Sequence, residues 1–221
     1  MLDYSSLRKN MVESQVRTND ITDRRVLRAM LDLPREKFVP RDLQALAYNG
    51  EGLSLAGLAP GRSLPAPVVT ARLIQLAGLD FEERVLEIGC ATGYGTAVLA
   101  RIAKSVTGLD NAAGLTDLAQ ANLAELGVRN AEIVIGSLAA GASGNAPYDV
   151  IVVSGMLPEP PPAAWREQLR DGGRLIAILA DGPIGRATVF ERTGDRFSRR
   201  IAFDCTAPML PGFERKAEFI L

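Results

Sequence analysis

The chain has 221 residues, a formal net charge of −1 at pH 7, two cysteines and no histidine. The missing imidazole excludes Ser-His-Asp and Cys-His hydrolases and most transition-metal sites, so we expect no metal. The balanced charge, with no basic cluster larger than a pair of arginines, argues against a nucleic-acid partner. Neither a secretion signal nor an apolar run of about 18 residues is visible, so we expect a cytoplasmic protein without a membrane partner.

The N-terminal third predicts helices and one long loop. Apolar residues at near-helical spacing predict two helices within residues 5–32. Pro34–Pro40 predicts an extended connector, and residues 47–67, rich in Gly, Pro and Ala, predict a loop without regular structure. A loop of this length in a compact domain is usually functional or disordered. A helix over 67–77 follows, with Pro67 at its start.

From residue 84 onward, strands and helices alternate. Continuous apolar runs, as in Val150–Val153, are typical of strands that are covered on both faces. The pattern predicts strands at 84–89, 105–110, 131–136, 148–154 and 174–180 and helices at 93–103, 114–126 and 162–170. From Thr188 onward it predicts antiparallel strands at the sheet edge.

These elements predict an α/β fold with a Rossmann-like, doubly wound and mostly parallel sheet. We expect one domain over residues 1–221. Residues 1–78 would form an N-terminal helical layer with the active-site loop, and residues 79–221 would form the cofactor-binding sheet.

The most informative segment is Val85–Gly95, in which an apolar strand leads into a glycine-rich turn and then a helix. Glycines at this point let a ligand approach the main chain closely. About twenty residues later a second predicted strand ends at Asp110, where an acid can accept hydrogen bonds from ribose hydroxyls. The segment therefore predicts a nucleotide-like cofactor.

The turn favours S-adenosylmethionine over NAD. The dinucleotide fingerprint is G-x-G-x-x-G, whereas Gly89, Gly93 and Gly95 give G-x-x-x-G-x-G behind Glu87. A carboxylate at the strand end suits a cationic ligand better than a phosphate. The expected cofactor-lining residues are Glu87, Gly89, Cys90, Ala91, Thr92, Gly93, Asp110, Asn111, Ser137 and Leu138.

The chain resembles the protein-L-isoaspartate O-methyltransferases along nearly its whole length. The similarity rests on Val26–Met30, Pro34–Pro40 with Ala47-Tyr48, Arg84–Ala100, Ala121–Leu123 with Leu126-Gly127, Ala146–Asp149, and Glu167–Leu169 with Gly172–Leu175. The resemblance implies methyl transfer from S-adenosylmethionine to the α-carboxylate of an isoaspartyl residue, which is a protein-repair reaction. A carboxylate is already ionised near neutral pH and needs no base, in agreement with the lack of histidine.

The catalytic loop departs from the family pattern, which reads approximately G-Q-T-I-S-A-P-H. Here the segment is Gly61–Val68, and the family's carboxylate-holding hydroxyl falls on Pro65, which has neither a hydroxyl nor a backbone N–H. Ser63 matches the family's threonine and supplies a hydroxyl. Arg62 stands where glutamine is usual and, as a guanidinium, could grip a substrate carboxylate; the alternative is a solvated loop arginine.

Two cofactor positions differ as well. Ala91 occupies the middle glycine of the family's turn, and its methyl group is tolerable if φ is negative. Ser137 stands where the family has an aspartate that contacts the adenine amine, so we expect weaker cofactor binding by about 0.5–1.5 kcal/mol.

These departures leave three hypotheses open. The first is an isoaspartyl O-methyltransferase that acts on protein or peptide. The second is a methyltransferase with another acceptor, either a small molecule or a protein. The third is a non-catalytic protein that retains the cofactor pocket for structure or sensing.

Overall fold

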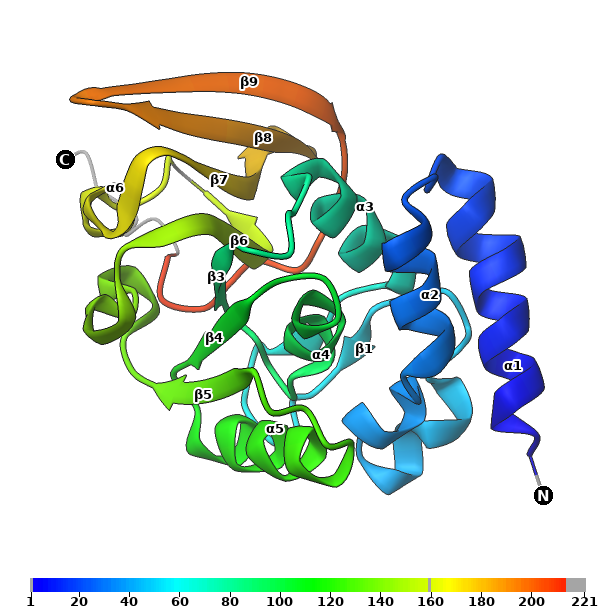
Figure 1. The fold of residues 1–221 in the computed structure, drawn as a ribbon. Coiled ribbons are helices and arrows are strands. Elements are labelled where there is room, and N and C mark those ends of the chain that lie inside the picture. Colours follow the sequence, from blue (N-terminus) through cyan, green and yellow to red (C-terminus); the bar gives the residue numbers. More distant parts are fainter. Residues whose placement is uncertain (1, 159, 214–221) are drawn as a thin grey trace, which may run out of the picture.

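The computed structural model describes residues 2–158 and 160–213, which form a central sheet flanked by helices (Figure 1). Within this part of the chain the main sheet has seven strands in the order β5-β4-β3-β6-β7-β8-β9. The strands from β5 to β7 pair in parallel, and β8 and β9 add in antiparallel orientation. The strands are β3 Arg84–Ile88, β4 Ser105–Asp110, β5 Ala131–Ile135, β6 Tyr148–Leu157, β7 Leu169–Asp181, β8 Ile184–Thr193 and β9 Arg196–Asp204. The mostly parallel α/β fold with antiparallel edge strands is confirmed.

The α-helices of the described residues mostly follow the predicted positions. They are α1 Tyr4–Met11, α2 Arg24–Asp32, α3 Pro67–Ala77, α4 Tyr94–Ala100, α5 Ala113–Glu125 and α6 Ala163–Gln168. The predictions of helices at 93–103 and 162–170 were too long. Leu169 already belongs to β7, because it pairs with Tyr148 of β6, so the strand predicted at 174–180 begins earlier.

Each face of the sheet buries its own apolar layer. Side chains alternate along β3, so Val85 faces one cluster while Leu86 and Ile88 face the other. The first cluster also holds the buried faces of α3, α4 and α5, with α1 and α2 packed outside them. The second contains Trp165 of α6, whose Nε1 donates to Leu138 O at 2.8 Å. Trp165 thus anchors α6 on the sheet.

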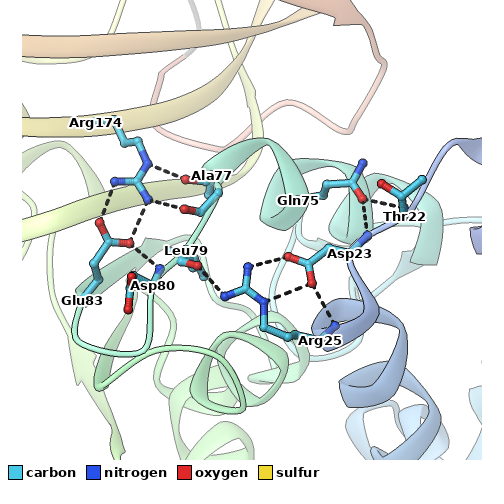
Figure 2. A network of polar contacts seen from close by, with 10 residues as sticks. Thr22, Asp23, Arg25, Gln75, Ala77, Leu79, Asp80, Glu83 and Arg174 are labelled. Atoms are coloured by element: carbon cyan, nitrogen blue, oxygen red, sulfur yellow. Dashed lines mark hydrogen bonds and ion pairs between the residues drawn. The ribbon is translucent and has the colours of Figure 1, made fainter.

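A polar network joins the outer helices to the sheet (Figure 2). Gln75 Oε1 of α3 accepts from the backbone N–H groups of Thr22 and Asp23, and Asp23 caps α2 by accepting from Arg25 N at 2.8 Å. Arg174 of β7 donates to both oxygens of Glu83, at 2.7 and 2.8 Å. Arg174 also donates to the carbonyls of Ala77 and Gly78, so these bonds fix the end of α3 and the loop that follows it against the sheet.

Two N-terminal predictions were wrong in detail. The Pro34–Pro40 connector is not extended throughout, because Arg35–Phe38 form a 3-10 turn. Residues 47–67 are not free of regular structure, because β1 Leu53–Ser54 and β2 Ser63–Leu64 pair as a short antiparallel hairpin. A second 3-10 helix covers Arg41–Leu46. Such short elements have too few residues to show a periodic pattern in the sequence.

The segment after β9 returns to the carboxyl edge of the sheet, where the red trace in Figure 1 runs beside β6. Met156 pairs with Met209 in a parallel bridge, and Leu210 N donates to Met156 O at 2.9 Å. The chain's last described residues therefore lie at the sheet edge where ligands bind in such folds. None of the helices in residues 2–158 and 160–213 is long and apolar enough to span a membrane.

Candidate functional site

The glycine-rich turn follows the carboxyl end of β3, beside the point between β3 and β6 where the strand order reverses. The backbone N–H groups of Gly89 and Cys90 donate to Leu109 O at 2.8 and 3.1 Å, which holds the turn against β4. Gly89 and Gly93 have φ of +78° and +88°, values that glycine adopts without strain. The sequence prediction of a strand, turn and helix at this position is confirmed.

Ala91 does not have the negative φ at which its methyl group would be tolerated. Its φ is 51°, in the left-handed region that favours glycine. Its side chain is buried and its N–H donates to Asp110 Oδ2 at 2.8 Å. A non-glycine residue at this φ carries local strain that a glycine would relieve.

Glu87 lies beneath the turn and is buried. Its carboxylate accepts from Ser154 Oγ and Thr96 Oγ1, each at 2.5 Å, and a Cβ added to Gly95 would lie directly against Glu87 Oε1. Burial raises the pKa of Glu87, and the hydroxyl hydrogen bonds oppose that rise. In this structure the side chain ties β3 to β6 and to the start of α4, and its contact with a cofactor stays a prediction.

Asp110 ends β4 as predicted and is completely buried. Its Oδ1 accepts from Asn111 N at 2.9 Å, and its Oδ2 accepts from Ala91 N and from Arg62 Nη2. Arg62 forms a salt bridge with this carboxylate, and its side chain is only 3% exposed. The interpretation of Arg62 as a solvated loop arginine is therefore wrong. It does pair with a carboxylate, although that carboxylate belongs to the protein itself.

Leu210 fills the space over the first glycine of the turn. A Cβ added to Gly89 would lie 2.8 Å from Leu210 Cδ2 and 3.4 Å from Arg62 Nη2, and one added to Gly155 would lie 2.5 Å from Leu210 Cγ. Leu210 itself is 1% exposed. Glycines at these positions thus leave room for side chains of the same protein to pack on the backbone.

The loop that carries Arg62 and Ser63 is held by a buried arginine, Arg35. Its Nε donates to Ala47 O at 2.9 Å and its Nη2 donates to Pro65 O at 2.7 Å, so it joins both ends of the loop. Its guanidinium lies 4.8 Å from the centre of the Tyr94 ring. Burial lowers the pKa of Arg35, because no carboxylate among the described residues forms an ion pair with it.

The remaining predicted residues serve different parts of the site. Thr92 is buried, with Oγ1 donating to Phe38 O at 2.5 Å and its carbonyl accepting from Asn122 Nδ2 at 3.0 Å. Burial raises the pKa of the Cys90 thiol well above its usual range, in agreement with a packing role. Leu138 is buried, whereas Asn111 and Ser137 are exposed near the ends of β4 and β5.

A separate cavity of about 310 Å³ lies at the opposite edge of the sheet. Its lining includes Arg84, Ser105 and Ala131, which begin β3, β4 and β5. Ligands of open α/β sheets bind beyond the carboxyl ends of the strands. This cavity is therefore not the candidate site.

Comparison with known proteins agrees with this geometry. Residues 6–204 match the model of the family described as protein-L-isoaspartate(D-aspartate) O-methyltransferase. The chain belongs to this family. Its acid at the end of β4 and its glycine turn are thus those of a protein-L-isoaspartate O-methyltransferase family member.

Similar proteins carry the same family name. The protein-L-isoaspartate O-methyltransferase of Methanoculleus marisnigri is 39% identical over 77% of this chain and 76% of its own length. That of Koribacter versatilis is 33% identical over 90% of this chain and 87% of its own length.

Solved structures show the same fold. One protein-L-isoaspartate O-methyltransferase structure superposes with a TM-score of 0.79 at 26% identity, over 93% of this chain and 66% of that chain. A Plasmodium falciparum structure in complex with S-adenosyl-L-homocysteine gives a TM-score of 0.74 at 19% identity, over 95% and 99% of the two chains.

Sequence reasoning missed three residues that shape the site. Leu210 packs on the turn from a segment with no predicted element, Arg35 holds the loop ends, and Thr96 binds Glu87. The family motif containing Arg35 was visible, but its side-chain contacts were not. Nothing local to Leu210 signals its position, because residues 205–213 reach the turn only through the fold.

Proposed function

We propose that this protein is an S-adenosylmethionine-dependent O-methyltransferase that methylates the carboxylate of isoaspartyl residues in protein or peptide. The observation that carries the proposal is Asp110, a buried acid at the carboxyl end of β4 that faces the glycine turn in a chain of this family. The related Plasmodium falciparum structure in complex with S-adenosyl-L-homocysteine supports the same cofactor here. A cytoplasmic location also stays a prediction from the sequence.

The residues at the turn suit a cationic, ribose-containing cofactor. Asp110 offers carboxylate oxygens to ribose hydroxyls, and Glu87 and Asp110 together place negative charge where a sulfonium or ammonium would be stabilised. Ser137 and Asn111, at the ends of neighbouring strands, are the proposed partners of the adenine end. Gly89, Gly93 and the backbone between them, including Cys90, Ala91 and Thr92, would form the floor, and Leu138 would pack beneath Ser137.

The reaction places few chemical demands on side chains. When bound, S-adenosylmethionine supplies an electrophilic methyl group on a sulfonium. An acceptor carboxylate is ionised at neutral pH, so the protein needs no general base. Its task is to hold the carboxylate in line with the methyl group and to exclude water. Ser63, on β2, and Arg62, beside it, are the proposed acceptor-binding residues.

The experiment is a methylation assay with tritium-labelled S-adenosylmethionine and a synthetic peptide that contains one isoaspartyl residue. The matched control is the same peptide with a normal aspartyl residue. Base-labile label on the isoaspartyl peptide alone is the expected result, and Asp110→Asn should abolish it. Equal labelling of both peptides, or none with cofactor bound, would reject the isoaspartyl acceptor.

A second candidate is methylation of a different carboxylate acceptor. The observation that favours it is Pro65, which is buried and whose carbonyl accepts from Arg35, so this position has no hydroxyl to offer. Label transfer to a component of a cell extract, undiminished by competing isoaspartyl peptide, would favour this candidate over the first.

A further inference from the structure

Asp110 already uses both of its oxygens within the chain. Oδ1 accepts from Asn111 N, and Oδ2 accepts from Ala91 N and Arg62 Nη2. The Arg62 guanidinium therefore stands at the carboxylate that ribose hydroxyls are proposed to bind. A carboxylate has about four lone-pair sites, of which three are taken here, and Asp110 is completely buried, so a ribose hydroxyl reaches it only if a group that now covers it moves.

Arg62 is an imperfectly satisfied partner in this position. Its side chain is 3% exposed, and its Nε is buried with no hydrogen-bond partner among the described residues. A guanidinium has five N–H donors, and a carboxylate can accept two of them in parallel. Only one such bond to Asp110 forms here. The unpaired donor makes the buried position of Arg62 less stable than a bidentate pair would be.

Leu210 lies close to the same position of the turn as Arg62. It packs on Gly89 and Gly155, beside Arg62. The two segments also touch each other, since a Cβ added to Gly61 would lie 3.2 Å from Pro211 Cγ. The segment of Leu210 is held to β6 by two backbone bonds of 2.9 Å, Leu210 N to Met156 O and Met156 N to Pro208 O.

We propose that Arg62 and Leu210 form a gate over the cofactor site, and that Arg62 exchanges partners when the gate opens. In the closed arrangement, which the structure shows, Arg62 holds Asp110. Ribose hydroxyls take Asp110 only after Arg62 leaves, and the released guanidinium then binds the acceptor carboxylate beside Ser63. Cofactor affinity is therefore reduced by the stability of the closed gate. This inference rests on the proposed function.

The exchange has a distinctive consequence for the two ligands. Removing the guanidinium frees Asp110 and should strengthen cofactor binding, while it removes a carboxylate partner and should weaken acceptor binding. A purely structural arginine would not change the two affinities in opposite directions. Glutamine at position 62 keeps a polar side chain of similar length, so Arg62→Gln is the appropriate variant for cofactor binding.

The test is calorimetric titration of S-adenosylhomocysteine into the full chain. Arg62→Gln should bind it roughly tenfold more tightly than the unsubstituted protein if the open state is about a tenth of the population. Leu210→Ala should shift affinity in the same direction, and it serves if Arg62→Gln fails to fold. Arg72→Gln is the matched control, because Arg72 stacks on Phe203 away from the turn. In the methylation assay, Arg62→Met, which has no N–H donor, should raise the KM for peptide; glutamine is unsuited to this arm because it is usual at this position in the family.

The other outcomes distinguish failure of the gate, of the acceptor role of Arg62 and of the proposed function. Equal or weaker binding of S-adenosylhomocysteine by Arg62→Gln and Leu210→Ala would overturn the gate while leaving the proposed function intact. Tighter binding with an unchanged peptide KM in Arg62→Met would keep the gate and reject the acceptor role of Arg62. If all variants fold, by circular dichroism, but none binds S-adenosylhomocysteine, the proposed function fails and the gate with it.

Discussion

Arg62, which precedes β2, forms a buried salt bridge with Asp110 at the end of β4, across 48 residues of sequence. The bridge joins the loop before β2, which carries the proposed acceptor-binding residue Arg62, to the end of β4. Both partners are almost inaccessible to water, so each depends on the other for its charge to be tolerated. The contact couples the stability of the chain to the same carboxylate that is proposed to bind the cofactor.

Loss of Asp110 should therefore destabilise the protein as well as inactivate it. Asp110→Asn leaves Arg62 buried without a counter-charge, and we expect the free energy of unfolding to fall by about 3 kcal/mol. Chemical denaturation measures this change. A decrease below about 0.5 kcal/mol would indicate that Arg62 reaches solvent when its partner is removed.

The double variant Arg62→Gln/Asp110→Asn isolates the pair itself. Because neither charge remains, the double variant should lose about 1–3 kcal/mol less unfolding free energy than the sum of the losses of the two single variants. The measurement is a double-mutant cycle by denaturant unfolding, with the same m-value required for all four proteins. Simple additivity would mean that the two side chains do not interact in solution.

Ala91 is expected to be a site of relievable strain. Ala91→Gly should raise the free energy of unfolding by up to about 1 kcal/mol, because φ of 51° costs an alanine but not a glycine. The control is Ala97→Gly in the buried part of α4, which should lower stability by about 1 kcal/mol or more. A loss of stability at both positions would contradict the left-handed geometry at Ala91.

Arg35 should be required to hold together the two ends of the loop between Ala47 and Pro65, which carries Arg62 and Ser63. Arg35→Lys cannot donate to Ala47 O and Pro65 O with the planar geometry of a guanidinium. We expect stability to fall by about 1.5–3 kcal/mol and proteolytic cleavage within residues 49–61 to become faster. Arg41→Lys, at an exposed position nearby, should change neither quantity. Unchanged cleavage in Arg35→Lys would show that the hairpin alone orders the loop.

The Arg174–Glu83 pair should contribute to acid stability (Figure 2). Burial alone would raise the pKa of Glu83, but hydrogen bonds from Arg174 and from the backbone N–H of Asp80 outweigh it and hold the pKa below 4.5. A lowered carboxyl pKa contributes stability that is present above the unfolded value and is lost as pH falls through the folded value. Glu83→Gln should therefore be less stable than the unsubstituted protein at pH 7.

The difference between the two proteins should be constant above about pH 5 and shrink as pH falls below about 4.5. Thermal unfolding at several pH values measures it. Glu82→Gln provides the control, because the Glu82 side chain is 82% exposed and, within residues 2–158 and 160–213, forms an ion pair only with Lys104. A difference that is independent of pH would mean that charge is not what stabilises the pair.

The sequence by itself determined the succession of strands and helices along the chain, the glycine turn at Gly89–Gly93, and Asp110 as the acid that ends the neighbouring strand β4. These features are local: apolar runs decide which strands are buried, and glycine decides where the backbone turns tightly. The family motifs likewise lie within short segments.

Only the tertiary structure decided what surrounds the acid. The partnership of Arg62 with Asp110, the packing of Leu210 on Gly89 and the two carbonyls held by Arg35 each join segments far apart in the chain. Ala91, at a left-handed φ, likewise donates a hydrogen bond to a carboxylate on another strand. Side-chain identity fixes what a residue can bind, but a non-local contact depends on which elements the whole sheet brings together, and no periodicity or motif encodes that distance.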